Sequence, residues 1–263
     1  MVDTNNDLLK KLVDPGSVDY FVGVGSGAFE GSQSTAVGGF SSALTAGVTE
    51  DIWCEDGEKE WLTSAEIINV FSSSADDTAA GSGARTLLLN GLDAAGSPIS
   101  EVVTLNGITP VVTSNAYLFV SSAFLLTAGS GETNAGDISF QASVSASIQN
   151  CIPAGNGLTD SAHYQTPLGK QFLPLSFEFS ATKVAGGQLP LVNFNIQARF
   201  RAPDSAWISI LSRDLDTAVQ NQLEIYNAVP ISIQQGAQLR VQATSSENNT
   251  IARCRINGVA VDI

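Results

Sequence analysis

Alternation of apolar and polar side chains with a period of two residues runs through much of this sequence. Between Leu191 and Ala202, apolar residues occupy the even positions, and Asn, Gln or Arg occupy most of the odd ones. Successive side chains of a β-strand point to opposite faces, so this pattern predicts a strand with one buried face. The same alternation extends from Ile138 to Asn150 and from Leu175 to Ser180.

Turn-forming residues separate these segments at short intervals. Asp93–Pro98 predicts a hairpin loop between strands at 85–92 and 99–106. Further strands are expected at 206–213, 238–244 and 251–256. Helical patterns are confined to the N-terminal arm and the segments 63–68 and 217–225. We therefore predict an all-β fold of antiparallel β-sandwich or jelly-roll-like domains, with a short N-terminal arm that is helical or extended.

The stretch from Cys151 to Gln171 interrupts the alternation with proline and glycine. It suggests four parts: an N-terminal docking arm (1–16), an N-terminal β-domain (17–150), a linker (151–170) and a C-terminal β-sandwich domain (171–263). A single sandwich with a long excursion is the alternative. The Gly- and Ser-rich segment 23–47 is expected to be a surface loop or an arm lying along a neighbouring chain.

Leucines in the first sixteen residues have helical spacing. Leu8, Leu9 and Leu12 would form one face of a short helix that ends at Pro15 and Gly16. We interpret this segment as an assembly contact that docks on a partner, and a frayed terminus is the alternative. The segment lacks the apolar stretch of a secretory signal.

The charge and the lengths of the apolar runs argue against two classes of partner, nucleic acids and membranes. The chain has 12 Lys and Arg against 26 Asp and Glu, for a formal net charge of -14. So few basic residues, thinly spread, do not suit binding to a nucleic-acid backbone. No apolar run approaches the roughly 20 residues of a membrane helix, so no membrane partner is expected.

The sequence contains few residue patterns that indicate catalysis or ligand binding. Cys54, Cys151 and Cys254 are far apart and odd in number, so we expect three buried, reduced thiols. His163, the single histidine, has Asp160 nearby but no serine in a G-x-S-x-G turn, and we expect a surface residue. The chain contains no complete nucleotide-binding motif. We therefore predict no catalytic, cofactor-binding or metal-binding residues, no cofactor, and no enzyme activity.

Acidic residues between positions 50 and 60 flank Trp53 and Trp61. Two tryptophans beside carboxylates are compatible with a glycan-binding platform, but an acidic hairpin with both rings packed inward is the favoured interpretation. Asp76–Asp77 and the loop 132–137 carry oxygen ligands suited to Ca²⁺, but in no established calcium-binding spacing. Arg199 and Arg201 are expected on an outward strand face, as assembly contacts with an acidic neighbour or as solvated side chains.

Two segments resemble known proteins. Ser72–Phe140 contains SADDTAAGSGAR, GLDAAGSPISEVVTLNG and NAGDI, and is similar to a family of virion structural proteins of tailed bacteriophages. The segment 230–263, PISIQQGAQLRVQATSSENNTIARCRINGVAVDI, resembles the end of a phage jelly-roll or sandwich domain. This resemblance implies capsid-decoration, head-fibre or tail-associated proteins, and no catalytic residues.

These observations together predict a structural component of a bacteriophage virion. We expect a decoration, fibre or tail-associated protein that forms a homotrimer and binds other virion proteins of the capsid or tail. The strand faces of Ser, Asn, Gln and Thr, poor in Lys and Arg, and the negative net charge favour the exterior of the particle. The alternative is a module that binds a carbohydrate or host receptor, such as a host surface glycan, on the particle surface.

Overall fold

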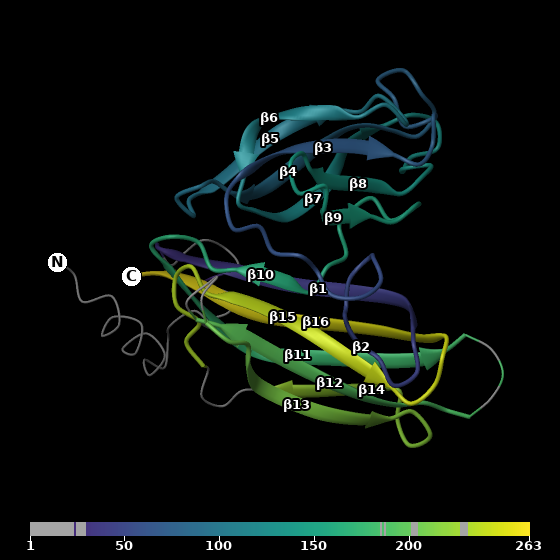
Figure 1. Ribbon diagram of the computed structural model, residues 1–263, viewed down its shortest axis with the longest axis vertical. Helices are drawn as coiled ribbons and strands as arrows, with labels where there is room; N and C mark the ends of the chain where they lie inside the picture. Colours follow the sequence, from purple (N-terminus) through teal and green to yellow (C-terminus); the bar gives the residue numbers. More distant parts are fainter. Residues whose placement is uncertain (1–23, 25–29, 185, 187, 201–204, 227–230) are drawn as a thin grey trace, which may run out of the picture.

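The protein consists of two β-structured parts, one above the other (Figure 1). This computed structural model describes residues 24, 30–184, 186, 188–200, 205–226 and 231–263. Every element named within these residues is a β-strand, and the strands pair antiparallel, which confirms the predicted all-β class. No helix of the described residues is long and apolar enough to span a membrane.

The lower part, which we call the sandwich, packs two sheets face to face. Its first sheet has the order β1-β16-β11-β14, and its second has the order β10-β15-β12-β13, with β2 also paired to β15. The strands are β1 (Ser32–Leu44), β2 (Thr49–Asp51), β10 (His163–Gln165), β11 (Lys170–Lys183), β12 (Leu191–Arg199), β13 (Ile208–Asp216), β14 (Gln222–Tyr226), β15 (Gln238–Ser245) and β16 (Thr250–Asp262).

The core of the sandwich comes from the alternation seen in the sequence. Val192, Phe194 and Ile196 of β12 are fully buried, and Phe194 stacks on Phe179 of β11 in the opposite sheet, with ring centroids 4.7 Å apart. The residues between them face away from this core, as the period of two requires.

The upper part, which we call the inserted unit, contains two smaller sheets, β6-β3-β8-β9 and β5-β4-β7, and has a separate buried core. Its strands are β3 (Glu66–Ser72), β4 (Ala84–Leu92), β5 (Pro98–Thr104), β6 (Val111–Tyr117), β7 (Phe119–Ala128), β8 (Ile138–Ala142) and β9 (Ile148–Ile152). The expected hairpin across Asp93–Pro98 joins β4 to β5.

Three expectations about local structure were wrong. The segments 63–68 and 217–225 contain the starts of β3 and β14 rather than helices. The expected continuous strand from 138 to 150 is a hairpin, because the chain turns between β8 and β9, where Ala146 has a φ of 57°. The carboxylate of Glu66 accepts hydrogen bonds from the backbone amides of Val144 and Ser145 and so stabilises this turn.

The strand pairing also differs from the expected division at residues 150 and 170. β1 and β2 belong to the sandwich, where β1 pairs along β16 and β2 along β15. The expected linker contains β10, which pairs with β15. The inserted unit therefore interrupts the sandwich, as in the alternative of one sandwich with an excursion. A local pattern shows that a strand exists but not which distant strand it pairs with.

Segment 23–47, expected as a loop or an arm, contains β1. Gly39 of this strand lies so close to the backbone of Ile52 and Ala162 that a Cβ atom would be 2.3 Å from the Ile52 carbonyl oxygen. The expected N-terminal docking arm, with Leu8, Leu9 and Leu12, lies outside the described residues.

Candidate functional site

Two chain segments connect the sandwich to the inserted unit, and we call them the joint (52–65 outward and 153–162 returning). The amide of Ala162 donates to the carbonyl of Ile52 at 2.9 Å, so the two segments are hydrogen-bonded at their base. A disulfide joins Cys54 in the outward segment to Cys151 at the end of the inserted unit, with a Cα–Cα distance of 6.1 Å. The expectation of three reduced thiols was wrong for this pair, while Cys254 is free and buried.

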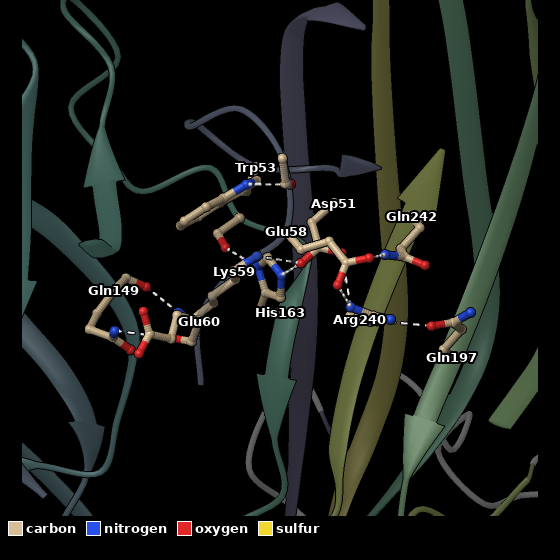
Figure 2. A network of polar contacts seen from close by, with 12 residues as sticks. Asp51, Trp53, Glu58, Lys59, Glu60, Gln149, His163, Gln197, Arg240 and Gln242 are labelled. Atoms are coloured by element: carbon tan, nitrogen blue, oxygen red, sulfur yellow. Dashed lines mark hydrogen bonds and ion pairs between the residues drawn. The ribbon is translucent and has the colours of Figure 1, made fainter. Parts of the chain in front are cut away.

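A buried histidine and carboxylate lie at the base of the joint (Figure 2). His163 Nε2 is 2.9 Å from Asp51 Oδ2, and His163 Nδ1 is 2.7 Å from the hydroxyl of Ser161. Burial lowers the pKa of His163 despite the hydrogen bond to Asp51. A neutral imidazole that donates Nε2–H to Asp51 leaves Nδ1 to accept from Ser161.

Asp51 is held by several donors. The backbone amide of Lys59 donates to its Oδ2 at 2.8 Å, and Arg240 Nη1 lies 3.6 Å from its Oδ1. Burial alone would raise the pKa of Asp51, but the hydrogen bonds from His163 and the Lys59 amide, with the charge of Arg240, hold this pKa below its ordinary value. The carboxylate is therefore ionised at neutral pH.

Arg240 connects this centre to the sheet surface. Its Nη1 is 3.0 Å from Glu58, and its Nε donates to Gln197 at 2.8 Å. Gln242 donates to the other oxygen of Glu58 at 3.1 Å. Strands β12 and β15 thus hold the outward segment of the joint through polar side chains (Figure 2).

Lys59 is the most unusual group of the joint, because its amine is buried among aromatic rings. Its Nζ lies 5.9 Å from the ring centroid of Trp53, 5.7 Å from that of Trp61 and 5.0 Å from that of Phe119, and it donates to the carbonyl of Gln149. Burial lowers the pKa of Lys59 to about 7, although Asp51 opposes this shift. The cation–π contacts and the hydrogen bond partly offset the cost of burying the ammonium.

The structure corrects the expectation for His163 as a surface residue. In the sequence, the acidic residue near His163 is Asp160, three residues away. In the structure, the carboxylate that contacts the imidazole belongs to Asp51, which is 112 residues away. Ser161, His163 and Asp51 have exposed fractions of only 7%, 3% and 1%. They form a Ser-His-Asp hydrogen-bonded chain that is almost fully buried, although Ser161 and His163 contribute to the lining of a second groove of about 580 Å³.

The two tryptophans of the joint pack against neighbouring aromatic rings. Trp53 is 5% exposed, with its ring 5.5 Å from His163, edge on. Trp61 stacks on Phe119 at 5.4 Å, which fixes the outward segment against the inserted unit. Trp53 therefore packs inward, while Trp61 is partly buried.

The candidate arginine contacts and calcium ligands also have defined surroundings. Arg199 lies over the ring of Trp207 at 4.8 Å and donates to Gln238 at 2.9 Å, while Arg201 lies outside the described residues. Asp77 is buried and accepts hydrogen bonds from the amides of Ala84, Ala135 and Gly136. Its carboxylate serves to hold the two glycine-rich loops of the inserted unit together.

A groove of about 970 Å³ lies beside the joint, between β7 of the inserted unit and the outer face of the sheet β1-β16-β11-β14. Gly38, Arg255, Glu178 and Glu224 form one row across its floor, because they are direct partners in the strand register. Sequence reasoning missed this site, since the residues of the row lie on four strands far apart in the chain.

Comparisons with known proteins give little guidance. No protein-family model and no curated protein sequence matches the chain. Three similar solved structures are of infectious bursal disease virus: the Gx strain (12% identity, TM-score 0.22), the Gt strain (11%, 0.17) and the VP2 subviral particle (12%, 0.20). Each alignment covers all of this chain and 78% of the other. The similarity to these viral particle proteins is weak.

Proposed function

We propose that this protein is a structural component of a bacteriophage virion, on the exterior of the particle, that assembles through β-domain contacts. The observation that carries the proposal is the pair of open sheet edges on the side of the sandwich away from the inserted unit (Figure 1). Within the described residues, β13 and β14 each have a strand partner on one side only. An open edge offers unpaired backbone groups to a neighbouring chain.

Exposed apolar side chains accompany these edges. Ile208 on β13 is 54% exposed and Tyr226 on β14 is 73% exposed. An apolar side chain on an unpaired edge favours association, and closed homo-oligomers bury such edges. A homotrimer is the assembly that we propose. The phage-like segment Ser72–Phe140 lies in the inserted unit, which would then point away from the assembly contact.

The oligomeric state tests this proposal directly. We expect the purified chain to have the mass of a trimer by size-exclusion chromatography with light scattering, and Ile208→Lys to shift it towards monomer. Val102→Lys is the matched control, since Val102 is 59% exposed on β5 of the inserted unit, and it should leave the trimer intact. A wild-type chain that stays monomeric at high concentration would contradict the proposed assembly.

Location on the particle needs a separate test. Antibodies against the inserted unit should label intact virions in electron micrographs if that unit faces outward. Deletion of residues 1–16, which include Leu8, Leu9 and Leu12, should release the protein from the capsid or tail and leave the trimer intact. Labelling only of disrupted particles would contradict an exterior position.

We propose no catalytic role, because Ser161, His163 and Asp51 are almost fully buried. The alternative function, binding of a carbohydrate or host receptor, loses Trp53 as a platform because its ring is buried. The groove between β7 and the sheet β1-β16-β11-β14, and not the tryptophans, has side chains suited to binding a carbohydrate.

A further inference from the structure

We propose that the groove between β7 and the outer face of the sheet β1-β16-β11-β14 binds a neutral oligosaccharide. Its volume of about 970 Å³ is at the upper end of the range of small-molecule sites. It is lined by both the sandwich and the inserted unit, and Gly38 leaves its floor without a side chain at one end of the central row.

The floor of the groove offers donors and acceptors side by side. Arg255 lies directly opposite Glu178 on the neighbouring strand, and Glu178 lies directly opposite Glu224 on the next. Ser180 and Gln222 form a second pair one step along the same strands. Vicinal hydroxyl groups of a sugar both donate and accept hydrogen bonds, so they suit adjacent carboxylate, guanidinium and amide groups.

These side chains keep hydrogen-bonding capacity for a ligand. The described part of the chain gives the guanidinium of Arg255 no hydrogen bond and no ion pair. Glu178 accepts at Oε1 from Asn257 at 2.7 Å, and Glu224 accepts at Oε1 from the hydroxyl of Tyr226. In each carboxylate the Oε2 atom is left for another donor.

One wall of the groove is apolar. Phe124 of β7 is 41% exposed and Leu158 of the joint is 54% exposed, and a backbone bridge holds these residues beside each other. An exposed aromatic ring above a polar floor matches the two kinds of surface of a pyranose, which has an apolar C–H face and a rim of hydroxyl groups. The ring is the group on which we expect the sugar to stack.

Charge and backbone geometry select this occupant over others. Asp160, Glu178 and Glu224 face Arg253 and Arg255 in the lining, so three acids nearly balance two bases, and neither a polyanion nor a polycation is favoured. An extended peptide finds its best partners at a sheet edge, where backbone groups are free, but this floor is a sheet face. A neutral ligand with many hydroxyl groups suits both the nearly balanced charge of the lining and a floor that offers side chains and no free backbone groups.

The test is binding of the full chain to an array of neutral oligosaccharides (glucans, mannans, galactans and N-acetylglucosamine oligomers), with heparin and polylysine as charged probes. We expect at least one neutral oligosaccharide to bind and the charged probes not to bind. Phe124→Ala and Arg255→Gln should each weaken binding of that oligosaccharide about tenfold or more in calorimetric titration. Val102→Ala and Arg213→Gln are the matched controls on other exposed strands, and should leave the affinity unchanged.

A substitution that fills the groove gives a second, independent measurement. A Cβ atom on Gly38 would make only an ordinary contact, 3.6 Å from the Cys254 carbonyl oxygen, so Gly38→Leu should fold and block the floor. Circular dichroism and the melting temperature confirm folding of each variant. The proposal is overturned if no neutral oligosaccharide binds, if heparin or polylysine binds in its place, or if folded groove variants bind as well as wild type. Oligosaccharide binding and oligomeric state are separate measurements, so a failure of this proposal is distinguishable from a failure of the virion proposal.

Discussion

Asp51 Oδ2 and His163 Nε2 lie 2.9 Å apart although 112 residues separate them in the chain. Asp51 is the last residue of β2, where the chain leaves the sandwich, and His163 is the first residue of β10, where it returns. This contact therefore closes the base of the inserted unit. Both side chains are almost fully buried, so their protonation is linked to the stability of the fold.

We predict that the protein is less stable at pH 5 than at pH 8. Burial lowers the pKa of His163 below 6.5, so the unfolded chain binds this proton more readily than the folded one. The stability that depends on neutral His163 is full above pH 6.5 and falls as the pH drops below it. Asp51, with its lowered pKa, adds a further loss below about pH 3.8. Urea unfolding at several pH values measures the effect, and His163→Gln should flatten the profile between pH 5 and pH 7.

Lys59 gives a prediction at higher pH. Its pKa is about 7 in the folded protein against 10.5 as the ordinary value, so unfolding takes up a proton between these values, and stability rises with pH through that window. Lys59→Met removes the buried charge at similar volume. The variant should be more stable than wild type at pH 6, and this advantage should shrink by pH 9. A constant difference between the two proteins across this range would show that Lys59 does not titrate as described.

The fold class was predictable from the sequence because it depends on local alternation. Val192, Phe194 and Ile196 could be assigned to a buried face from their spacing alone. The domain boundaries were not predictable in the same way, since they depend on the pairing of β1 with β16 across more than two hundred residues. The turn at Ala146 was also hidden, because the residue with positive φ is Ala and not the Gly or Asn that usually marks such a turn in a sequence.

The candidate sites were harder to predict for the same reason. His163 was judged beside its sequence neighbour Asp160, and nothing near it in the chain indicated Asp51. The disulfide was missed because the spacing of Cys54 and Cys151 matches no motif, although Cys54 lies in the joint and Cys151 just precedes its returning segment. The groove row that contains Arg255 and Glu178 exists only through strand register.

We predict that the disulfide contributes strongly to stability. Cys54 and Cys151 are 97 residues apart, and the bond encloses the whole inserted unit, so its loss frees a long loop in the unfolded chain. The double variant Cys54→Ser/Cys151→Ser should be less stable by about 2–5 kcal/mol in urea unfolding. Reductant should destabilise wild type and leave the double variant unchanged. Cys254→Ala is the control that keeps the bond, and equal sensitivity of all three proteins to reductant would contradict the prediction.

The near-complete burial of the Ser-His-Asp chain predicts an unreactive serine. Ser161 is only 7% exposed, so a fluorophosphonate probe should not reach its hydroxyl in the folded protein. Mass spectrometry of the probe-treated chain measures this, with a serine hydrolase as the positive control. Labelling at Ser161 that disappears in His163→Gln would instead identify an active nucleophile and contradict the proposal of no catalysis.

Asp77 organises the loops of the inserted unit, and its replacement should be costly. Its Oδ1 accepts from the amides of Ala84 and Ala135, and its Oδ2 accepts from the amide of Gly136 and the hydroxyl of Ser72. Asp77→Ala leaves these buried donors without an acceptor, so we expect a loss of roughly 2–4 kcal/mol in unfolding free energy.

Asp76→Ala is the matched control for this prediction, because the neighbouring Asp76 is exposed and should cost little. If Asp77 instead bound a calcium ion, chelator would destabilise wild type as much as the substitution does. Thermal unfolding with and without chelator separates the two roles. The hydrogen bonds already made by both carboxylate oxygens favour the structural one, because each oxygen accepts from two donors.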